Sequence, residues 1–155
     1  MIMRNSQLAK HLIEMMEIDQ ELRFMAKPEK GLVNFVIYAV DGVHNQRLHR
    51  IIDENGFPTE AMVGVEALHA LWLLVQHQDY DIRLQESCLK KCGFALPDKA
   101  HLTDRVLVSR GKAQRFGTQW YRKNGKFVLR PIENEKKVDA LRKEYGLAKL
   151  QRKRQ

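Results

Sequence analysis

The residues best suited to chemistry lie directly behind the most apolar run of the chain. Trp72 to Val75 is entirely apolar, and the ten residues that follow are mostly polar, five of them of types suited to acid/base or ligand chemistry. On a continuous helix, residues four apart face the same way, so His77 and Asp81 would be neighbours. An imidazole held by a carboxylate is the usual arrangement of a general base, and also of a metal ligand with its hydrogen-bonding partner. These five residues are Gln76, His77, Asp79, Asp81 and Gln85.

The sequence therefore predicts acid/base or ligand chemistry at His77, with Asp79 or Asp81 as the orienting carboxylate. A structural interpretation stands beside it. Aspartate is a favoured N-cap because its carboxylate accepts the free N–H groups at the start of a helix. A histidine at the end of a helix faces the negative end of the helix dipole. A corner between two helices would explain the same residues without any site.

Two further pairs have the spacing of metal ligands on a helix, Glu66 with His69 and Asp98 with His101. A carboxylate-bridged metal pair needs two more carboxylates on other helices, and none is positioned convincingly. The chain also lacks a phosphate loop, a nucleotide-binding glycine pattern and a Ser-His-Asp signature. We therefore expect no metal and no cofactor, with His69 in the wall of the core and His101 on a helix surface.

Apolar residues at helical spacing predict most of the secondary structure. The Asn124-Gly125 dipeptide is the strongest hairpin signal in the chain and predicts two strands, one from Arg115 to Tyr121 and one from Lys126 to Arg130. The expected fold is mainly α with a small C-terminal β-hairpin (α+β), in a single domain over residues 1–148 with a basic, flexible tail at 149–155. The expected helices cover residues 6–27, 31–55, 65–76, 82–91, 98–109 and 133–145.

The composition is that of a small soluble protein. The 155 residues are 44% hydrophobic and 30% charged, and no segment approaches the roughly 20 apolar residues of a membrane span. Polar residues interrupt any apolar stretch behind Arg4, so we expect no secretory signal. Cys88 and Cys92 are the only cysteines, and their spacing on a helix is too wide for a relaxed disulfide. Two reduced thiols in a cytoplasmic protein are expected, with no membrane partner.

Positive charge is concentrated in the last third of the chain. Residues 110–155 hold fifteen Lys or Arg against four Asp or Glu, whereas residues 1–109 hold twelve against fifteen. This polarity predicts either a solvated surface or an attraction for RNA, another polyanion or an acidic protein face. Aromatic residues alternate with basic ones on the expected hairpin, as a single-strand platform would require. The residues of this alternative nucleic-acid site are Arg115, Phe116, Trp120, Tyr121, Arg122, Lys123, Lys126 and Phe127.

Two later stretches add polar groups. Asp104 and Arg105 are adjacent on an expected helix and diverge, so each would meet a partner elsewhere, either in an ion pair or, for Arg105, in holding a carboxylate or phosphate. Gly117 inside an expected strand indicates a bulge or a close approach by another group. Thr118 and Gln119 beside it supply neutral donors and acceptors.

Taken in order, several motifs of the chain resemble a bacterial family, the domain of unknown function numbered 6624. The resemblance covers almost the whole chain. The likeness extends to the first helix and to the segment after the hairpin. The motifs are Asp19 with Arg23, Asp41 with Asn45, Ile51-Ile-Asp-Glu-Asn-Gly-Phe-Pro-Thr59, Trp72-Leu-Leu-Val-Gln-His-Gln-Asp79, Leu102-Thr-Asp-Arg-Val106, Gln114 with Gly117-Thr-Gln119, Pro131-Ile-Glu133, Val138-Asp139 and Gly146-Leu147.

The resemblance implies which polar residues belong to the family's pattern, and it implies no activity. Polar positions shared by a family over several elements are more easily explained by one pocket than by unrelated caps. We therefore hypothesise a pocket for a small-molecule or peptide ligand around His77, serving a cofactor-independent hydrolase or transferase. The chain departs from the pattern at Val43-His44 and at His101. The hypothetical ligand-binding residues are Gln76, Gln85, Asp104, Arg105 and Gln119, and alternative functions are polyanion binding and protein interaction.

Overall fold

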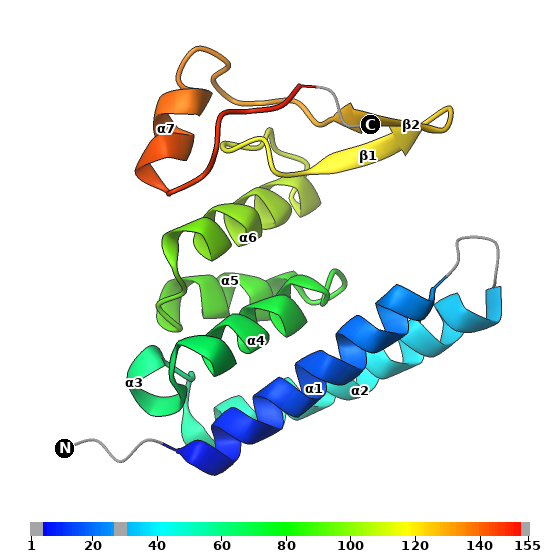
Figure 1. The fold of residues 1–155 in the computed structure, drawn as a ribbon, viewed down its shortest axis with the longest axis vertical. Helices are drawn as coiled ribbons and strands as arrows, with labels where there is room; N and C mark the ends of the chain where they lie inside the picture. Colours follow the sequence, from blue (N-terminus) through cyan, green and yellow to red (C-terminus); the bar gives the residue numbers. More distant parts are fainter. Residues whose placement is uncertain (1–4, 27–30, 153–155) are drawn as a thin grey trace. The chain divides into compact units, whose positions relative to one another are not determined.

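The computed structural model describes residues 5–26 and 31–152 (Figure 1). The chain forms two compact units, Met1–Phe94 and Ala95–Gln155, which we call the first and second units. The predicted mainly helical fold with one small hairpin is confirmed, whereas the single domain stays a prediction. No described helix is long and apolar enough to cross a membrane. The elements are α1 (Ser6–Met25), α2 (Gly31–Asn55), α3 (Glu60–Val63), α4 (Val65–Gln76), α5 (Ile82–Lys91), α6 (Leu96–Ser109), β1 (Trp120–Lys123), β2 (Lys126–Leu129) and α7 (Val138–Glu144).

Helices α1 and α2 form an antiparallel pair in the first unit (Figure 1). Asn5 donates a hydrogen bond to Asn55 at 3.5 Å at one end, and Arg23 contacts Asp41 at 2.7 Å toward the other. Inward-facing side chains, which we call the seam, are spaced four, three and four residues apart on α1 and three, four and three residues apart on α2, so one face of each helix lies inward. The seam residues are Leu8, Leu12, Met15 and Asp19 on α1, and Ile51, Leu48, His44 and Asp41 on α2.

The seam changes character along its length. Its first half is aliphatic, as expected of a helix pair that packs by apolar burial. Its second half carries Asp19, Asp41 and His44, and both Asp19 and His44 are only 3% exposed. Buried charged groups cost free energy unless they are paired, so these side chains must find partners inside the unit.

Helix α4 is the centre of the first unit, as its nearly uniform apolar sequence predicts. It contacts α1, α2, α3 and α5, and its residues Leu71, Leu74 and Val75 are fully buried. The last carbonyl groups of α4 are not left to solvent. Gln85 donates to the carbonyl of Val75 at 3.2 Å, and Gln78 donates to that of Leu74 at 3.2 Å. These bonds fix the corner at which α4 ends.

The helix α5 begins with the predicted cap. Asp81 Oδ1 accepts the backbone N–H of Leu84 at 3.0 Å, which satisfies one of the free donors of the first turn. Cys88 and Cys92 are free and fully buried, so the expectation of two reduced thiols is confirmed. The hydrogen bond between the two thiols and their burial raise the pKa of Cys88, which keeps its thiol protonated and unreactive.

In the second unit, the segment between α6 and β1 is organised by one carboxylate. Asp104 is fully buried and accepts the backbone N–H groups of Arg115, Phe116 and Thr118 at 2.7 to 3.2 Å, together with the Thr118 hydroxyl at 2.9 Å. Because these N–H groups point at Asp104, they cannot pair with a neighbouring strand. The predicted strand from Arg115 is therefore wrong in its first half, and β1 starts only at Trp120.

The predicted Asn-Gly hairpin is confirmed. Asn124 and Gly125 both have positive φ, 51° and 76°, as the tightest hairpin turns require, and Lys123 pairs with Lys126. Gln114 supports the end of the hairpin opposite the turn. Its buried side chain donates to the carbonyl groups of Gln119 and Arg130 and accepts the Gln119 N–H. A single buried amide thus closes the loop onto the second strand.

Several boundaries differ from the sequence predictions. Helix α6 starts at Leu96 because Pro97, expected in the preceding loop, sits in its first turn, where a missing N–H costs nothing. The last helix starts at Val138, five residues later than predicted, since Gln114 and Ile132 form a bridge and a turn follows. Helix α1 ends at Met25, and position 27 of its predicted range lies outside the described residues.

The chain beyond α7 packs back onto the loop at Gly117. A Cβ at Gly117 would lie 2.7 Å from Leu150 Cδ1, so the close approach predicted there is made by a side chain of the same unit. The Leu150 N–H donates to Asp139 at 2.8 Å, and Arg152 pairs with Glu135 at 2.5 Å. The segment predicted to be a flexible tail thus has definite contacts up to residue 152, and residues 153–155 lie outside the described residues.

Replacing Asp104 by alanine should lower the free energy of unfolding by about 3 kcal/mol or more, because the buried N–H of Phe116 and the partly buried N–H groups of Arg115 and Thr118 would lose their acceptor. Chemical denaturation followed by circular dichroism measures the change. Glu133→Gln is the matched control, because Glu133 makes only an exposed pair with Arg115 and should cost about 0.5 kcal/mol or less. Equal losses in the two variants would contradict the role given to Asp104.

Candidate functional site

A buried carboxylate on α1 contacts the imidazole at the end of α4. Asp19 Oδ2 lies 3.0 Å from His77 Nδ1, and Arg23 Nε lies 3.1 Å from Asp19 Oδ1. The three residues come together because Asp19 and Arg23 are one helical turn apart, while His77 is the C-cap of α4, which packs on α1. A buried aspartate, an arginine and a half-buried histidine therefore share one site in the first unit.

Two groups contact Nδ1 of His77. Its Nδ1 lies 3.1 Å from both Arg23 Nε and Asp19 Oδ1, yet the arginine can only donate. Arg23 Nε–H donates to Asp19 Oδ1 and, in the tautomer with a bare Nδ1, to His77, whereas in the other tautomer His77 Nδ1–H donates to Asp19. Burial raises the pKa of Asp19, but the hydrogen bond and charge of His77 and the charge of Arg23 outweigh it and hold this pKa below its ordinary value. With Nδ1–H donating to Asp19, Nε2 is the ring nitrogen left to accept a hydrogen bond.

Two residues of α2 extend the site. Arg23 Nη2 contacts Asp41 Oδ1 at 2.7 Å, so one guanidinium holds carboxylates of both α1 and α2. His44, one turn beyond Asp41, offers a ring nitrogen within 4.8 Å of oxygens of Asp19 and Asp41. Burial lowers the pKa of His44 against the opposing charges of Asp19 and Asp41, which keeps the ring neutral at neutral pH.

His44 also contains an unsatisfied atom. Its Nδ1 is buried and has no hydrogen-bond partner among the described residues. Leaving such a group unpaired typically costs about 1–3 kcal/mol, and most buried polar atoms in folded proteins are paired. An orphaned nitrogen in a cluster of charged groups therefore points to a function of this residue beyond packing.

A second polar group links α2 to the corner before α5. Asp81 Oδ2 accepts a hydrogen bond from Asn45 at 3.0 Å and lies 2.7 Å from His49 Nε2. Burial raises the pKa of Asp81, but the bonds from Asn45, His49 and the Leu84 N–H together lower it below its ordinary value. Both oxygens of Asp81 are therefore engaged in contacts that hold α2 and α5 together.

These contacts change the predicted partner of His77. The sequence predicts Asp79 or Asp81 as its orienting carboxylate, but Asp19, 58 residues away in sequence, is the one that contacts Nδ1. Asp81 caps α5 instead, and Asp79 is exposed. The physical reason is that α4 ends at Gln76, so the residues after it no longer follow the helical spacing on which the prediction depends.

The other predicted site residues fall into two groups. Gln76 is half-buried and Gln85 is fully buried at the end of α4, where Gln85 donates to the carbonyls of Val75 and Gln76. Asp104, Arg105 and Gln119 belong to the second unit. Asp104 is engaged with backbone N–H groups there, and Gln119 donates to Thr118 at 3.1 Å. A pocket that joins both groups stays a prediction.

Comparison with known proteins places the chain in a family. The model of the family described as "Family of unknown function (DUF6624)" matches residues 6–154. The chain belongs to this family. No curated protein and no solved structure matches it.

The DUF6624 motifs that carried the sequence resemblance explain part of this geometry. Asp19 with Arg23, Asp41 with Asn45, and His77 come from three separate motifs, and the structure brings them together. Asp19, Arg23, Asp41 and Asn45 are not among the site residues that the sequence predicts. The available signal was the seam spacing, which puts Asp19 at a position where Leu8, Leu12 and Met15 predict another apolar residue.

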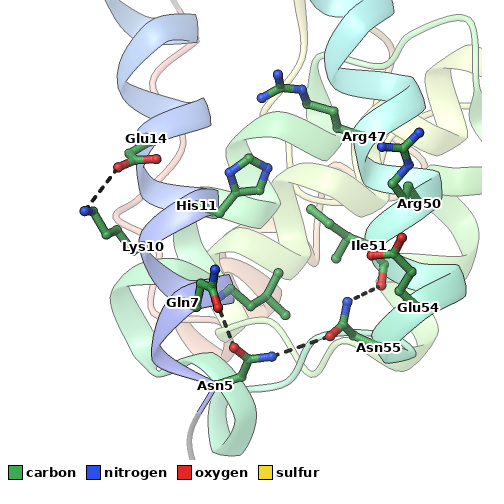
Figure 2. Close-up of a pocket in the computed structure, with 11 residues that line it drawn as sticks. Asn5, Gln7, Lys10, His11, Glu14, Arg47, Arg50, Ile51, Glu54 and Asn55 are labelled. Atoms are coloured by element: carbon green, nitrogen blue, oxygen red, sulfur yellow. Dashed lines mark hydrogen bonds and ion pairs between the residues drawn. The ribbon is translucent and has the colours of Figure 1, made fainter.

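The first unit also contains an open groove at the aliphatic end of the seam (Figure 2). Its volume is about 660 Å³, and its walls are the start of α1 and the end of α2. Lys10 pairs with Glu14 at 3.7 Å on one side, and Arg47 and Arg50 project from the other. None of Asp19, Asp41 and His77 lines this groove, so it is separate from the site.

The cap at Asp81 makes a pH-dependent contribution to stability. Its folded-state pKa is depressed, so its stabilisation is complete above the unfolded pKa of about 3.9 and is lost as pH falls through the lower, folded pKa. Asp81→Asn should therefore lose stability at neutral pH and show a shallower decline than the wild type in acid. Urea denaturation at a series of pH values between 7 and 2 tests this, and parallel curves for the two proteins would contradict it.

Proposed function

We propose that the first unit carries an acid/base site in which His77, oriented by Asp19, transfers protons in a hydrolase or transferase reaction. The observation that supports it is the contact of Nδ1 with the buried carboxylate of Asp19 at 3.0 Å. That contact orients the ring and, with the proton on Nδ1, would stabilise the imidazolium that forms when Nε2 takes up a second proton. A histidine at a helix end without such a partner has neither a defined orientation nor a stabilised imidazolium.

The proposed chemistry uses the other ring nitrogen. Nε2 of His77 has no hydrogen-bond partner among the described side chains, and the side chain is 16% exposed, so a small reactant can reach it. In the reaction, Nε2 accepts a proton from water or a substrate hydroxyl as that oxygen attacks. It then returns the proton to the leaving group.

Arg23 acts as a positioning residue in this proposal. Its guanidinium contacts Asp19 at 3.1 Å and Asp41 at 2.7 Å. It thereby holds α1 and α2 together around Asp19, the carboxylate that contacts His77. Its remaining exposure of 29% leaves an edge that faces solvent, where a substrate carboxylate or phosphate could meet a positive charge. Gln76, half-buried beside His77, would be a neutral contact at the rim.

His77→Gln should lower the rate of hydrolysis by about 10²–10⁴-fold while the protein stays folded, because an amide still donates to Asp19 but cannot take up a proton. Hydrolysis of p-nitrophenyl acetate and of bis(p-nitrophenyl) phosphate measures the activity, and circular dichroism with thermal unfolding measures the fold.

His11→Ala is the matched control, because His11 lines the separate groove and should leave the rate unchanged. A His77→Gln protein that loses stability but keeps the wild-type rate would show that His77 is structural. Absence of wild-type turnover on both esters would count against hydrolysis of these bond types.

A second candidate is polyanion binding by the second unit, favoured by exposed basic residues on the hairpin. Arg122, Lys123 and Lys126 are all exposed around the Asn-Gly turn. Arg122 lies 5.0 Å from the Phe127 ring centre and Arg130 lies 5.1 Å from that of Tyr121, so arginines cover both rings. Charge supports this candidate better than base stacking, since a base would have to displace the arginines.

Replacing Arg122, Lys123 and Lys126 by alanine should weaken binding to labelled poly(U) and lower the slope of log K against log salt by about 2, since each lost phosphate contact removes roughly 0.7. Fluorescence anisotropy at several salt concentrations measures both. The control variant removes Lys10, Arg47 and Arg50 of the first unit, the same total charge. Equal loss of slope in both variants would mean that binding follows net charge and not this hairpin.

A further inference from the structure

We propose that Asp19, Asp41 and His44 bind a divalent transition-metal ion, of the Zn²⁺ type, at the polar half of the helix seam. The inference deepens the proposed function and rests on it for the use of the ion, whereas binding itself can be measured without a substrate. It also differs from the prediction made from the sequence, which expects no metal and gives His44 no role.

The first argument is the geometry of the donor atoms. One oxygen from each carboxylate and one ring nitrogen of His44 lie within 4.8 Å of one another. Ligand atoms at about 2.1 Å from a common ion are at most about 4.2 Å apart, so small side-chain rotations complete the site. Asp41 and His44 are one turn apart on α2, and Asp19 faces them from α1, so both helices present rigid support.

The second argument is the unpaired nitrogen of His44. The residue is 3% exposed, and its Nδ1 has no partner among the described residues. A neutral imidazole that is buried against two carboxylates, with a lone pair to give, has the chemistry of a metal ligand. A structural role would instead require a hydrogen bond from the surrounding helices.

The third argument concerns charge. Within the cluster the carboxylates of Asp19 and Asp41 both face the guanidinium of Arg23. Arg23 contacts Oδ1 of both Asp19 and Asp41, and Oδ2 of Asp41 has no described partner. Oδ2 of Asp41 is therefore open to a cation, whereas Oδ2 of Asp19 already accepts Gln20 Nε2 at 2.7 Å and lies 3.0 Å from His77 Nδ1.

The donor set also selects the kind of ion. Mixed nitrogen and oxygen ligands suit Zn²⁺ and its neighbours, whereas Mg²⁺ and Ca²⁺ prefer oxygen alone. Asp19 would then contact both the ion and His77, so a metal-bound water would lie near the proposed base.

Titration of the EDTA-treated protein with Co²⁺, a spectroscopic substitute for Zn²⁺, tests the proposal. The expected result is one Co²⁺ per chain, with visible absorption that saturates at one equivalent and is displaced by Zn²⁺. His44→Ala should lower the affinity at least 100-fold, and Asp41→Asn at least tenfold. His11→Ala, which removes a histidine outside the cluster, should change neither spectrum nor affinity.

Arg23→Gln sharpens the test, because removing the competing positive charge should raise the affinity for Co²⁺. His44→Gln is a second, more conservative variant at the same position, and circular dichroism shows whether each variant is folded. Absence of saturable binding to the wild type would overturn the proposal, as would wild-type affinity in His44→Ala, His44→Gln and Asp41→Asn. Failure of the acid/base function is recognised separately, by His77→Gln retaining the wild-type rate of ester hydrolysis.

Discussion

The first unit depends on how it accommodates the buried carboxylate of Asp19. At its position in the α1–α2 seam, the spacing of Leu8, Leu12 and Met15 calls for another apolar side chain. A carboxylate there without partners would cost several kcal/mol. Arg23 and His77 compensate for this cost, and in doing so they bring α1, α2 and the end of α4 to one point. The polar site is therefore part of what holds the helices in register.

This arrangement explains why the site is found at the end of α4. A helix buried on nearly all sides gives a rigid platform, and the amides of Gln78 and Gln85 bind its last carbonyls. The backbone leaves the helix at His77, and the ring can then reach a partner on another element. In the proposed function, the apolar run fixes the end of the helix and the polar cluster behind it supplies the acid/base side chain.

The sequence predicted the elements whose signals are local. The apolar run of α4, the Asp81 cap and the Asn-Gly turn each depend on a few adjacent residues, and all three are confirmed. The contacts of the proposed site are not local. Asp19 and His77 are 58 residues apart, and no spacing rule within a helix can pair them.

A similar limit applies to the second unit. Asp104 was expected to meet a partner across the fold, and it binds the backbone of the loop 11 to 14 residues later. Because backbone N–H groups exist at every residue, the sequence contains no signal for such an acceptor. The strand predicted from Arg115 was wrong for the same reason, since alternating side chains do not reveal where the N–H groups point.

The outer end of the α1–α2 pair has a consequence for dynamics. Beyond Asp19 and Asp41, the side chains of Phe24, Leu32 and Phe35 are mostly exposed, between 68% and 92%. Local opening requires little free energy where few apolar contacts are lost, so amide hydrogens there should exchange faster than those around Leu12 and Leu48. The site lies at the boundary between these two regimes, with a stable aliphatic seam on one side and a readily opened helix end on the other.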